Sequence, residues 1–218
     1  MSREREEIRA IIESIVAMAD EVGGFLRAAS AAFIARDSGV LSALHDKDSE
    51  IDRLENANDA KCLRILALYQ PAADDLRTVF MALKINNDLE RIGDHALNIA
   101  ERSLEMQASP VPVLKDEFDR MTELTLGMLG DAINAFVARD AVLARSVVER
   151  DDLADGLFLH IVEAVLSGTW RDRSERECAV AMVFAAKEFE RIADLCTNLA
   201  EDVVFVAEGT NIRHEGQM

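Results

Sequence analysis

Residues that interrupt helices are scarce in this 218-residue sequence, which has only 10 Gly and 3 Pro. Aromatic residues are also few, at 5%. Half of the residues are nevertheless hydrophobic, so the chain can bury a substantial core in one elongated domain or two small ones. The scarcity of breakers, together with abundant Ala, Leu, Glu and Arg, predicts an all-α fold.

Basic residues are also in short supply, since 24 Lys and Arg face 41 Asp and Glu and leave a formal charge of -17. This charge repels the phosphate backbones of nucleic acids and anionic lipid head groups. We therefore expect neither nucleic-acid binding nor direct membrane insertion. Cations and basic protein surfaces are the expected partners.

Long apolar runs and paired cysteines are missing as well. No uncharged apolar run approaches the roughly 18 residues of a membrane span, and the N-terminal residues enter a charged helical pattern without a signal-peptide core. The three cysteines are scattered and form no Cys-x-x-Cys pair. We expect a cytoplasmic protein, with the cysteines acting as small core residues.

Signatures of catalysis are absent too. The sequence has no Gly-rich phosphate loop, no P-loop and no Ser-His-Asp signature. A di-iron carboxylate enzyme built on a helical bundle would need Glu-x-x-His motifs, and no histidine has Glu or Asp three residues before it. The sequence therefore predicts a protein that is not an enzyme.

Two segments of the sequence recur about a hundred residues apart. Ala32-Phe-Ile-Ala-Arg-Asp37 returns as Ala135-Phe-Val-Ala-Arg-Asp140, and Glu90-Arg-Ile-Gly-Asp94 returns as Glu190-Arg-Ile-Ala-Asp194. Between the copies, an uncharged stretch with Pro110 and Pro112 interrupts the helical pattern. The sequence thus predicts an internal duplication, with one three-helix bundle in residues 1–109 and another in residues 110–218.

Apolar residues at spacings of three and four give the helices of each half. We predict helices over residues 3–35, 38–69, 72–107, 114–138, 140–170 and 174–208. Helices of about 30 residues run some 45 Å, so two up-down-up bundles are an economical packing.

Acidic residues form rows on these predicted helices, turned away from the apolar stripes. A helical wheel places Glu90, Asp94, Asn98 and Glu101 together, and likewise Glu190, Asp194, Asn198 and Glu201. The second helix of the first half carries a matching row of Asp48, Asp52, Glu55 and Asp59. In the second half only Asp151 and Asp155 persist, because Phe158 and Val162 replace the other two acids. The second site should therefore be smaller or differently ligated.

Two interpretations of the rows compete. In so acidic a chain, solvated helix faces account for most acidic i,i+4 pairs. Their paired recurrence favours cation binding, because like charges at this spacing cost a few tenths of a kcal/mol without a counter-cation. The predicted metal ligands are Asp48, Asp52, Glu90, Asp94, Asn98, Asp151, Asp155, Glu190, Asp194 and Asn198. Their oxygen atoms suit magnesium, manganese, calcium or iron, and zinc is compatible, so the sequence does not choose a metal.

His95, whose copy is Leu195, is interpreted as a packing or surface residue.

Several of these segments resemble the PhoU family. They are Leu76-Arg77, Leu83-Lys84-Ile85, Asp88-Leu-Glu-Arg-Ile-Gly-Asp-His-Ala-Leu-Asn-Ile-Ala-Glu101, the second Glu190-Arg-Ile-Ala-Asp194, and the ending from Glu201 to His214. The likeness covers essentially the whole chain. Its most specific parts are the duplicated Glu-Arg-Ile-x-Asp core and the tail from Gly209 to His214. Ala193 and Leu195 depart from the Gly-His pair at Gly93 and His95.

The resemblance implies two similar three-helix bundles that hold multinuclear iron or zinc clusters through Glu/Asp-x-x-x-Asp motifs. These motifs match Asp48 with Asp52, Glu90 with Asp94, Asp151 with Asp155, and Glu190 with Asp194. It also implies a negative regulator of phosphate uptake and phosphate-starvation signalling, an adaptor between the phosphate ABC transporter ATPase and a sensor histidine kinase. We further expect a homodimer. The alternative is a metal-buffering or metal-dependent hydrolytic carboxylate-bundle protein.

Overall fold

The computed structural model describes residues 2–107, 109 and 111–208, and these residues form helices and connecting loops without any strand. The elements are α1 (Arg3–Ala35), the 3-10 turn η1 (Ser38–Val40), α2 (Leu41–Tyr69), α3 (Ala73–Glu101), α4 (Ser103–Met106), α5 (Lys115–Ala138), α6 (Ala141–Val148), α7 (Asp151–Ser167) and α8 (Arg173–Glu208). The predicted tail from Gly209 to His214 lies outside the described residues.

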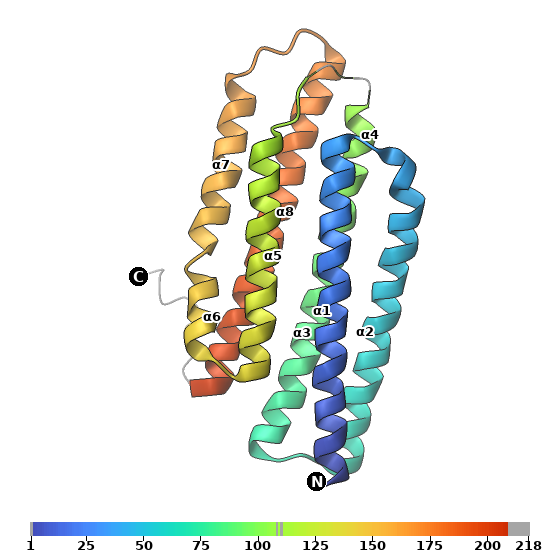
Figure 1. Ribbon diagram of the computed structural model, residues 1–218, viewed down its shortest axis with the longest axis vertical. Helices are drawn as coiled ribbons and strands as arrows, with labels where there is room; N and C mark the ends of the chain where they lie inside the picture. The colour runs from blue at the N-terminus through green and yellow to red at the C-terminus, as the bar shows by residue number, and fades with distance from the viewer. Residues whose placement is uncertain (1, 108, 110, 209–218) are drawn as a thin grey trace.

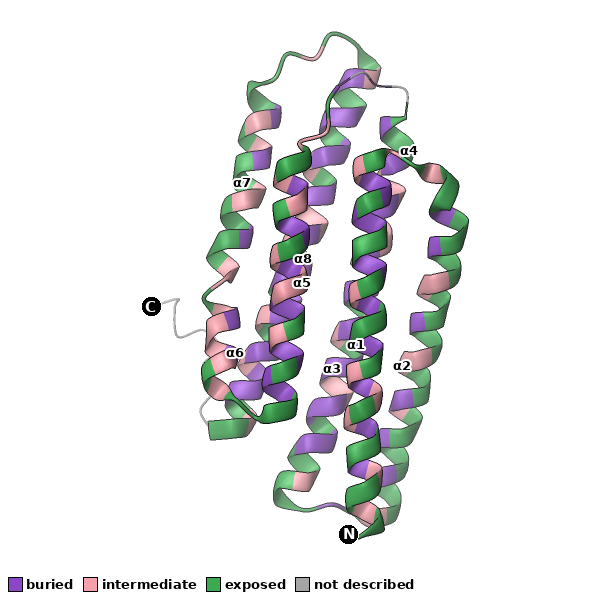
Figure 2. Ribbon diagram, viewed as in Figure 1, coloured by how far each residue is buried: buried purple, intermediate pink, exposed green. Residues whose placement is uncertain are grey.

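The helices make two three-helix bundles that stand side by side (Figure 1). One bundle consists of α1, α2 and α3, and the other of α5, the α6–α7 segment and α8. The bundles meet through α1 against α5 and α3 against α8. Buried residues line the inward faces of these helices, as Figure 2 shows. The predicted all-α fold of two similar bundles is therefore confirmed. No helix within the described residues is both long and apolar enough to cross a membrane.

The prediction of one continuous helix over residues 140–170 is wrong, because α6 ends at Val148 and α7 begins at Asp151. The backbone N–H of Arg150 donates to the Val147 carbonyl and not to the Ser146 carbonyl four residues back. The Ser146 carbonyl accepts a hydrogen bond from the Arg150 side chain, with Nε 3.1 Å from the oxygen. The same guanidinium contacts Asp131 of α5 at 2.6 Å. A side chain that takes over a backbone hydrogen bond in this way is an ordinary cause of a helix break.

Two other predicted helices also differ at their ends. The segment 72–107 is α3 followed after Arg102 by the single turn of α4, and the segment 38–69 opens with η1. Pro71 precedes α3, whose first turn holds Asp74 and Asp75, where the positive end of the helix dipole favours carboxylates.

The duplicated Ala-Arg-Asp segment ends a helix in each half. Arg36 and Arg139 adopt left-handed backbone angles, with φ of 55° and 53°. The N–H of Asp37 bonds the Ala32 carbonyl and the N–H of Asp140 bonds the Ala135 carbonyl, both at 2.9 Å. These are the bonds of a Schellman motif, so the repeat is a helix-ending signal used twice.

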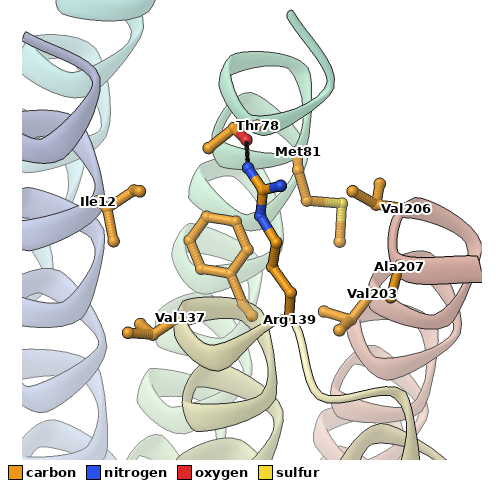
Figure 3. A pocket seen from close by; sticks show the side chains of 9 residues that line it. Ile12, Thr78, Met81, Val137, Arg139, Val203, Val206 and Ala207 are labelled. Atoms are coloured by element: carbon orange, nitrogen blue, oxygen red, sulfur yellow. Dashed lines mark hydrogen bonds between the residues drawn. The ribbon is translucent and has the colours of Figure 1, made fainter. Parts of the chain in front are cut away.

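The two arginines of this repeat also join the halves. The Arg36 guanidinium donates to the carbonyls of Met106, Ser109 and Val111 in the segment that links the bundles. Arg139 of the second half donates to Thr78 Oγ1 of α3 at 2.7 Å, beside a cavity of about 30 Å³ between the halves (Figure 3). That volume accommodates about a water molecule and no larger ligand. The repeat therefore fixes the two bundles to each other at opposite ends.

Candidate metal sites

The acidic rows of α2 and α3 face each other in the first half. Burial, together with the charges of Asp94, Glu55, Asp52 and Asp48, raises the pKa of Glu90 to about 7. Because three of these four acids belong to α2, the electrostatics place the two rows within reach of one another. The carboxylates of the two neighbouring helices are therefore close enough to influence one another's charge.

Neighbouring carboxylates also raise the pKa values of Asp48 and Glu55 in the first-half rows. The pKa of Asp48 is raised by burial and by Asp52 and Asp94, and the pKa of Glu55 by burial and by Asp59, Asp52 and Asp94. Both groups therefore hold their negative charge less readily than a solvated carboxyl does. A bound cation would relieve this repulsion.

The second half repeats the arrangement between α7 and α8. Burial, together with the charges of Glu190, Asp151 and Asp155 and partly offset by Lys187, raises the pKa of Asp194 to about 6. Asp151, the first residue of α7, also has a raised pKa because of burial, although Thr197 Oγ1 donates to it at 3.2 Å. The carboxylates from α7 and α8 thus influence one another electrostatically, as those of α2 and α3 do in the first half.

The second site contains Lys187, at the position that Asn87 occupies in the first half. Lys187 pairs with Glu190 and lies 5.4 Å from the centre of the Phe158 ring. Phe158 stands where Glu55 stands in the first half. The second half therefore has an aromatic ring in place of that acid, and Lys187 lies over the ring. Glu190 Oε2 is nevertheless buried without a hydrogen-bond partner among the described residues, which leaves a ligand oxygen available. The residues fit a cation here, with fewer carboxylates than in the first half.

The described residues contain no group of three or more His, Cys, Asp or Glu side chains already arranged as they would be around a metal ion. The rows face each other but do not close on one point. Rotation of the long Glu and Asp side chains is therefore required before they share an ion, and the metal ligands stay a prediction.

The two predicted asparagine ligands lie apart from the rows. Asn98 donates to Glu188 of α8 at 3.5 Å, so its amide faces the other half of the protein. Asn198 is exposed on α8, one turn beyond Asp194. Among the described residues, no hydrogen bond joins either asparagine to a carboxylate of its own row.

His95 has a partner that the sequence did not indicate. Its Nδ1 lies 2.6 Å from Glu188 Oε2, and both side chains are largely buried at the junction of α3 and α8. Burial alone would raise the pKa of Glu188, but His95 and Asn98 hold it below its ordinary value. The interpretation of His95 as a packing residue omitted this pairing, because its partner belongs to the other half.

A buried polar network anchors one end of the α2 row. Fully buried Asn86 donates to Asp59 Oδ1 and to the Glu55 carbonyl, both at 2.9 Å, and accepts from Asn58 at 3.0 Å. Asn58 in turn accepts from Ser14 at 2.6 Å. Two asparagines on otherwise apolar helix faces were the available sequence signal for this network.

In metal-free protein, we expect stability to fall as pH rises through the range in which Glu90 titrates. The folded state binds the Glu90 proton more tightly than the unfolded chain, so deprotonation from about pH 4.5 to about 7 favours unfolding. Solvent screening limits this contribution to on the order of 1 kcal/mol. Urea unfolding with a chelator at several pH values should show a shallower decline for Glu90→Gln than for wild type. Equal slopes for the two proteins would contradict the assignment.

Together, the duplicated bundles and their paired carboxylate rows define a helical-bundle protein with two acidic sites. Comparison with known proteins identifies the class further. The PhoU domain model matches twice, over residues 15–103 and 118–203. A phosphate-specific transport system accessory protein PhoU homolog of Pseudomonas putida is 33% identical over 98% of this chain and 82% of its own length. The corresponding protein of Aquifex aeolicus is 32% identical over 96% of this chain and 95% of its own length.

Solved structures agree. The crystal structure of PhoU from Pseudomonas aeruginosa matches with a TM-score of 0.86 and 31% identity, over 94% of this chain and 99% of that one. The phosphate transport system regulatory protein PhoU from Streptococcus pneumoniae matches with a TM-score of 0.88 and 25% identity, over 96% and 99%. The chain belongs to the PhoU family, the accessory proteins of phosphate-specific transport systems. It is a regulatory accessory protein and not an enzyme.

Proposed function

We propose that this protein is a metal-binding negative regulator of phosphate uptake and phosphate-starvation signalling. It acts as a non-catalytic adaptor between the phosphate ABC transporter and a sensor histidine kinase. Membership of the PhoU family supports the phosphate-transport role. The observation that carries the metal part is that, in both halves, carboxylates from two neighbouring helices lie close enough to raise one another's pKa.

The first site would use Asp48, Asp52, Glu90 and Asp94, and the second Asp151, Asp155, Glu190 and Asp194. A bound iron or zinc ion, or magnesium or manganese in their place, would neutralise the crowded carboxylates and join α2 to α3 or α7 to α8. The buried Glu190 oxygen without a hydrogen-bond partner supports a ligand role in the second site. Asn98 and Asn198 would join only after their side chains turn toward the rows.

The partners follow from the same proposal. A formal charge of -17 suits docking on basic surfaces of the transporter ATPase and of the kinase. The protein would act in the cytoplasm and reach the inner membrane through these partners. Two copies would associate as a homodimer.

Deleting the gene should derepress phosphate-scavenging genes in phosphate-rich medium. A reporter fused to a phosphate-starvation promoter measures this, and a plasmid copy of the wild-type gene should restore repression. As a matched comparison, the reporter strain can carry Glu90→Gln/Asp94→Asn or the control Asp119→Asn/Glu123→Gln. The control pair has the same i,i+4 spacing on α5, but Lys115 and Arg27 already pair with these acids. Unchanged reporter expression after deletion would discard the regulatory role.

A further inference from the structure

The ammonium group of Lys187 connects the two helices of the second acidic site. Its Nζ lies 2.5 Å from Glu190 Oε1 on α8 and 5.4 Å from the centre of the Phe158 ring on α7. The helices α7 and α8 pack against each other, so this positive charge lies between a carboxylate of one helix and an aromatic ring of the other. Linking α7 to α8 is also the task that the proposed function gives to a bound metal ion.

The first half has an uncharged residue at the position of Lys187. Asn87 stands three residues before Glu90, as Lys187 stands three residues before Glu190. Burial and the neighbouring carboxylates all raise the pKa of Glu90, and no cation offsets them. In the second half, Lys187 lowers the pKa of Asp194 against the same kind of crowding. The second half therefore contains a counter-charge on its own chain where the first half has an amide.

The two sites also differ in their number of carboxylates. Apart from Glu101 and its copy Glu201, which both halves have, the first-half rows contain six: Asp48, Asp52, Glu55, Asp59, Glu90 and Asp94. The second-half rows contain four: Asp151, Asp155, Glu190 and Asp194. These four together with Lys187 carry a formal charge of -3, against -6 for the six. In the first half His45 lowers the pKa of Asp48, but its ring pairs with Glu101 at 3.4 Å, outside the set of six.

Lys187 competes with a metal ion for Glu190. An ammonium group has three donors and no acceptor, so it cannot ligate a metal while it holds its proton. It occupies one oxygen of Glu190, whereas the other, Oε2, is buried without a hydrogen-bond partner among the described residues. The lysine side chain is 39% exposed and can therefore turn into solvent when an ion arrives.

We propose that Lys187 is a tethered counter-ion that takes over part of the metal ion's task in the second half, so that the two sites fill in a fixed order. The first site fills at low metal concentration, and the second fills only when an ion displaces Lys187 from Glu190. Repulsion between an ammonium and a divalent ion in a partly exposed site lowers affinity by about 10- to 100-fold. This inference rests on the metal-binding part of the proposed function and names the residue that makes the two sites unequal.

Calorimetric titration of the full-length protein with Zn²⁺ alone measures the two sites separately. Glu190→Gln/Asp194→Asn leaves only the first site, and Glu90→Gln/Asp94→Asn leaves only the second. We call these variants the first-site protein and the second-site protein. Circular dichroism should show the same helical content for both. The first-site protein should bind zinc about 10- to 100-fold more tightly than the second-site protein.

Exchanging the residues at the two equivalent positions tests the role of the lysine itself. In the second-site protein, Lys187→Asn should strengthen zinc binding about 10-fold or more, whereas Lys187→Arg, which keeps the charge, should not. In the first-site protein, Asn87→Lys should weaken zinc binding by a similar factor. The matched control is Lys115→Asn, which removes a lysine that pairs with Asp119 on α5, outside both sites. This control should leave both zinc affinities unchanged.

Metal-free protein gives a second readout that does not depend on zinc binding. With a chelator at pH 7.5, Lys187→Asn should lower the thermal unfolding midpoint by about 2–4 °C, because Glu190 loses its counter-charge. Lys187→Arg should keep the wild-type midpoint. A Lys187→Asn variant with the zinc affinity of its parent, or a midpoint that Lys187→Arg lowers equally, would overturn the proposal.

The failure of this inference is distinguishable from the failure of the proposed function. Zinc binding at neither site would overturn the filling order and the metal part of the proposed function together. Unchanged zinc affinities in all Lys187 variants, with a phosphate reporter that still responds to gene deletion, would refute only this inference. A normal order of filling without any effect of gene deletion would refute only the regulatory role.

Discussion

Replacing Phe118 with alanine should lower the free energy of unfolding by about 3–5 kcal/mol. Phe118 of α5 is fully buried, and its ring packs edge-on against Phe33 of α1, with the centroids 4.7 Å apart. On its other side lies Phe189 of α8, with centroids 6.2 Å apart. The substitution therefore removes a ring that fills the joint between the two bundles and leaves a cavity shared by three helices.

The joint has little capacity to collapse into that cavity. Beside it, Ser30 of α1 and Thr122 of α5 share a buried hydrogen bond of 2.6 Å that fixes the spacing of the two helices. Poor relaxation of this kind places the cost toward the upper part of the range for Phe→Ala substitutions.

Urea unfolding monitored by circular dichroism measures the loss, at one fixed protein concentration because association shifts apparent stability. Fluorescence of Trp170, the one tryptophan of the sequence, reports the second half, so coincident transitions validate a two-state treatment. The control Leu159→Ala, at an exposed position on α7, should change stability by less than about 0.5 kcal/mol. A Phe118→Ala loss below about 1 kcal/mol would mean that the aromatic joint does not hold the bundles together.

Local patterns in the sequence were enough to predict most of the fold. The apolar spacing gave α1 its observed bounds, and the repeated Ala-Arg-Asp segment marked the duplication. The break after Val148 could not be predicted, because it depends on Arg150 reaching Asp131 of another helix. The periodicity of one helix carries no information about a contact with another helix.

In the candidate sites too, features within one helix were predictable, whereas contacts between helices were not. The rows through Glu90 and Asp94 were predictable because residues three and four apart share a helix face. The pairing of His95 with Glu188, and the turn of Asn98 toward the same acid, depend on how the two bundles pack, which no single-helix pattern contains. The inter-half contacts of Arg36 and Arg139 were missed for the same reason.

Neutralising the central carboxylates of both sites should change stability with opposite signs in the absence and presence of metal. The variant is Glu90→Gln/Asp94→Asn combined with Glu190→Gln/Asp194→Asn. With a chelator at pH 7.5, it should be more stable than wild type, because Glu90 and Asp194 ionise there only against burial and their neighbours' charges. With iron or zinc at about 100 times the dissociation constant, wild type should gain about 2.7 kcal/mol for each site that binds the metal and the variant almost nothing.

Unfolding midpoints with and without metal, together with elemental analysis of protein purified without chelators, measure both effects. Changing one site at a time should remove the metal of that site alone, and the second should bind more weakly because Lys187 already neutralises part of its charge. The control Asp119→Asn/Glu123→Gln removes acids that pair with Lys115 and Arg27, so it should slightly destabilise the protein in either condition and leave the metal content unchanged. Equal metal content in wild type and the four-fold variant would show that the rows are solvated helix faces, because the crowding that raises these pKa values would then have no cation to relieve it.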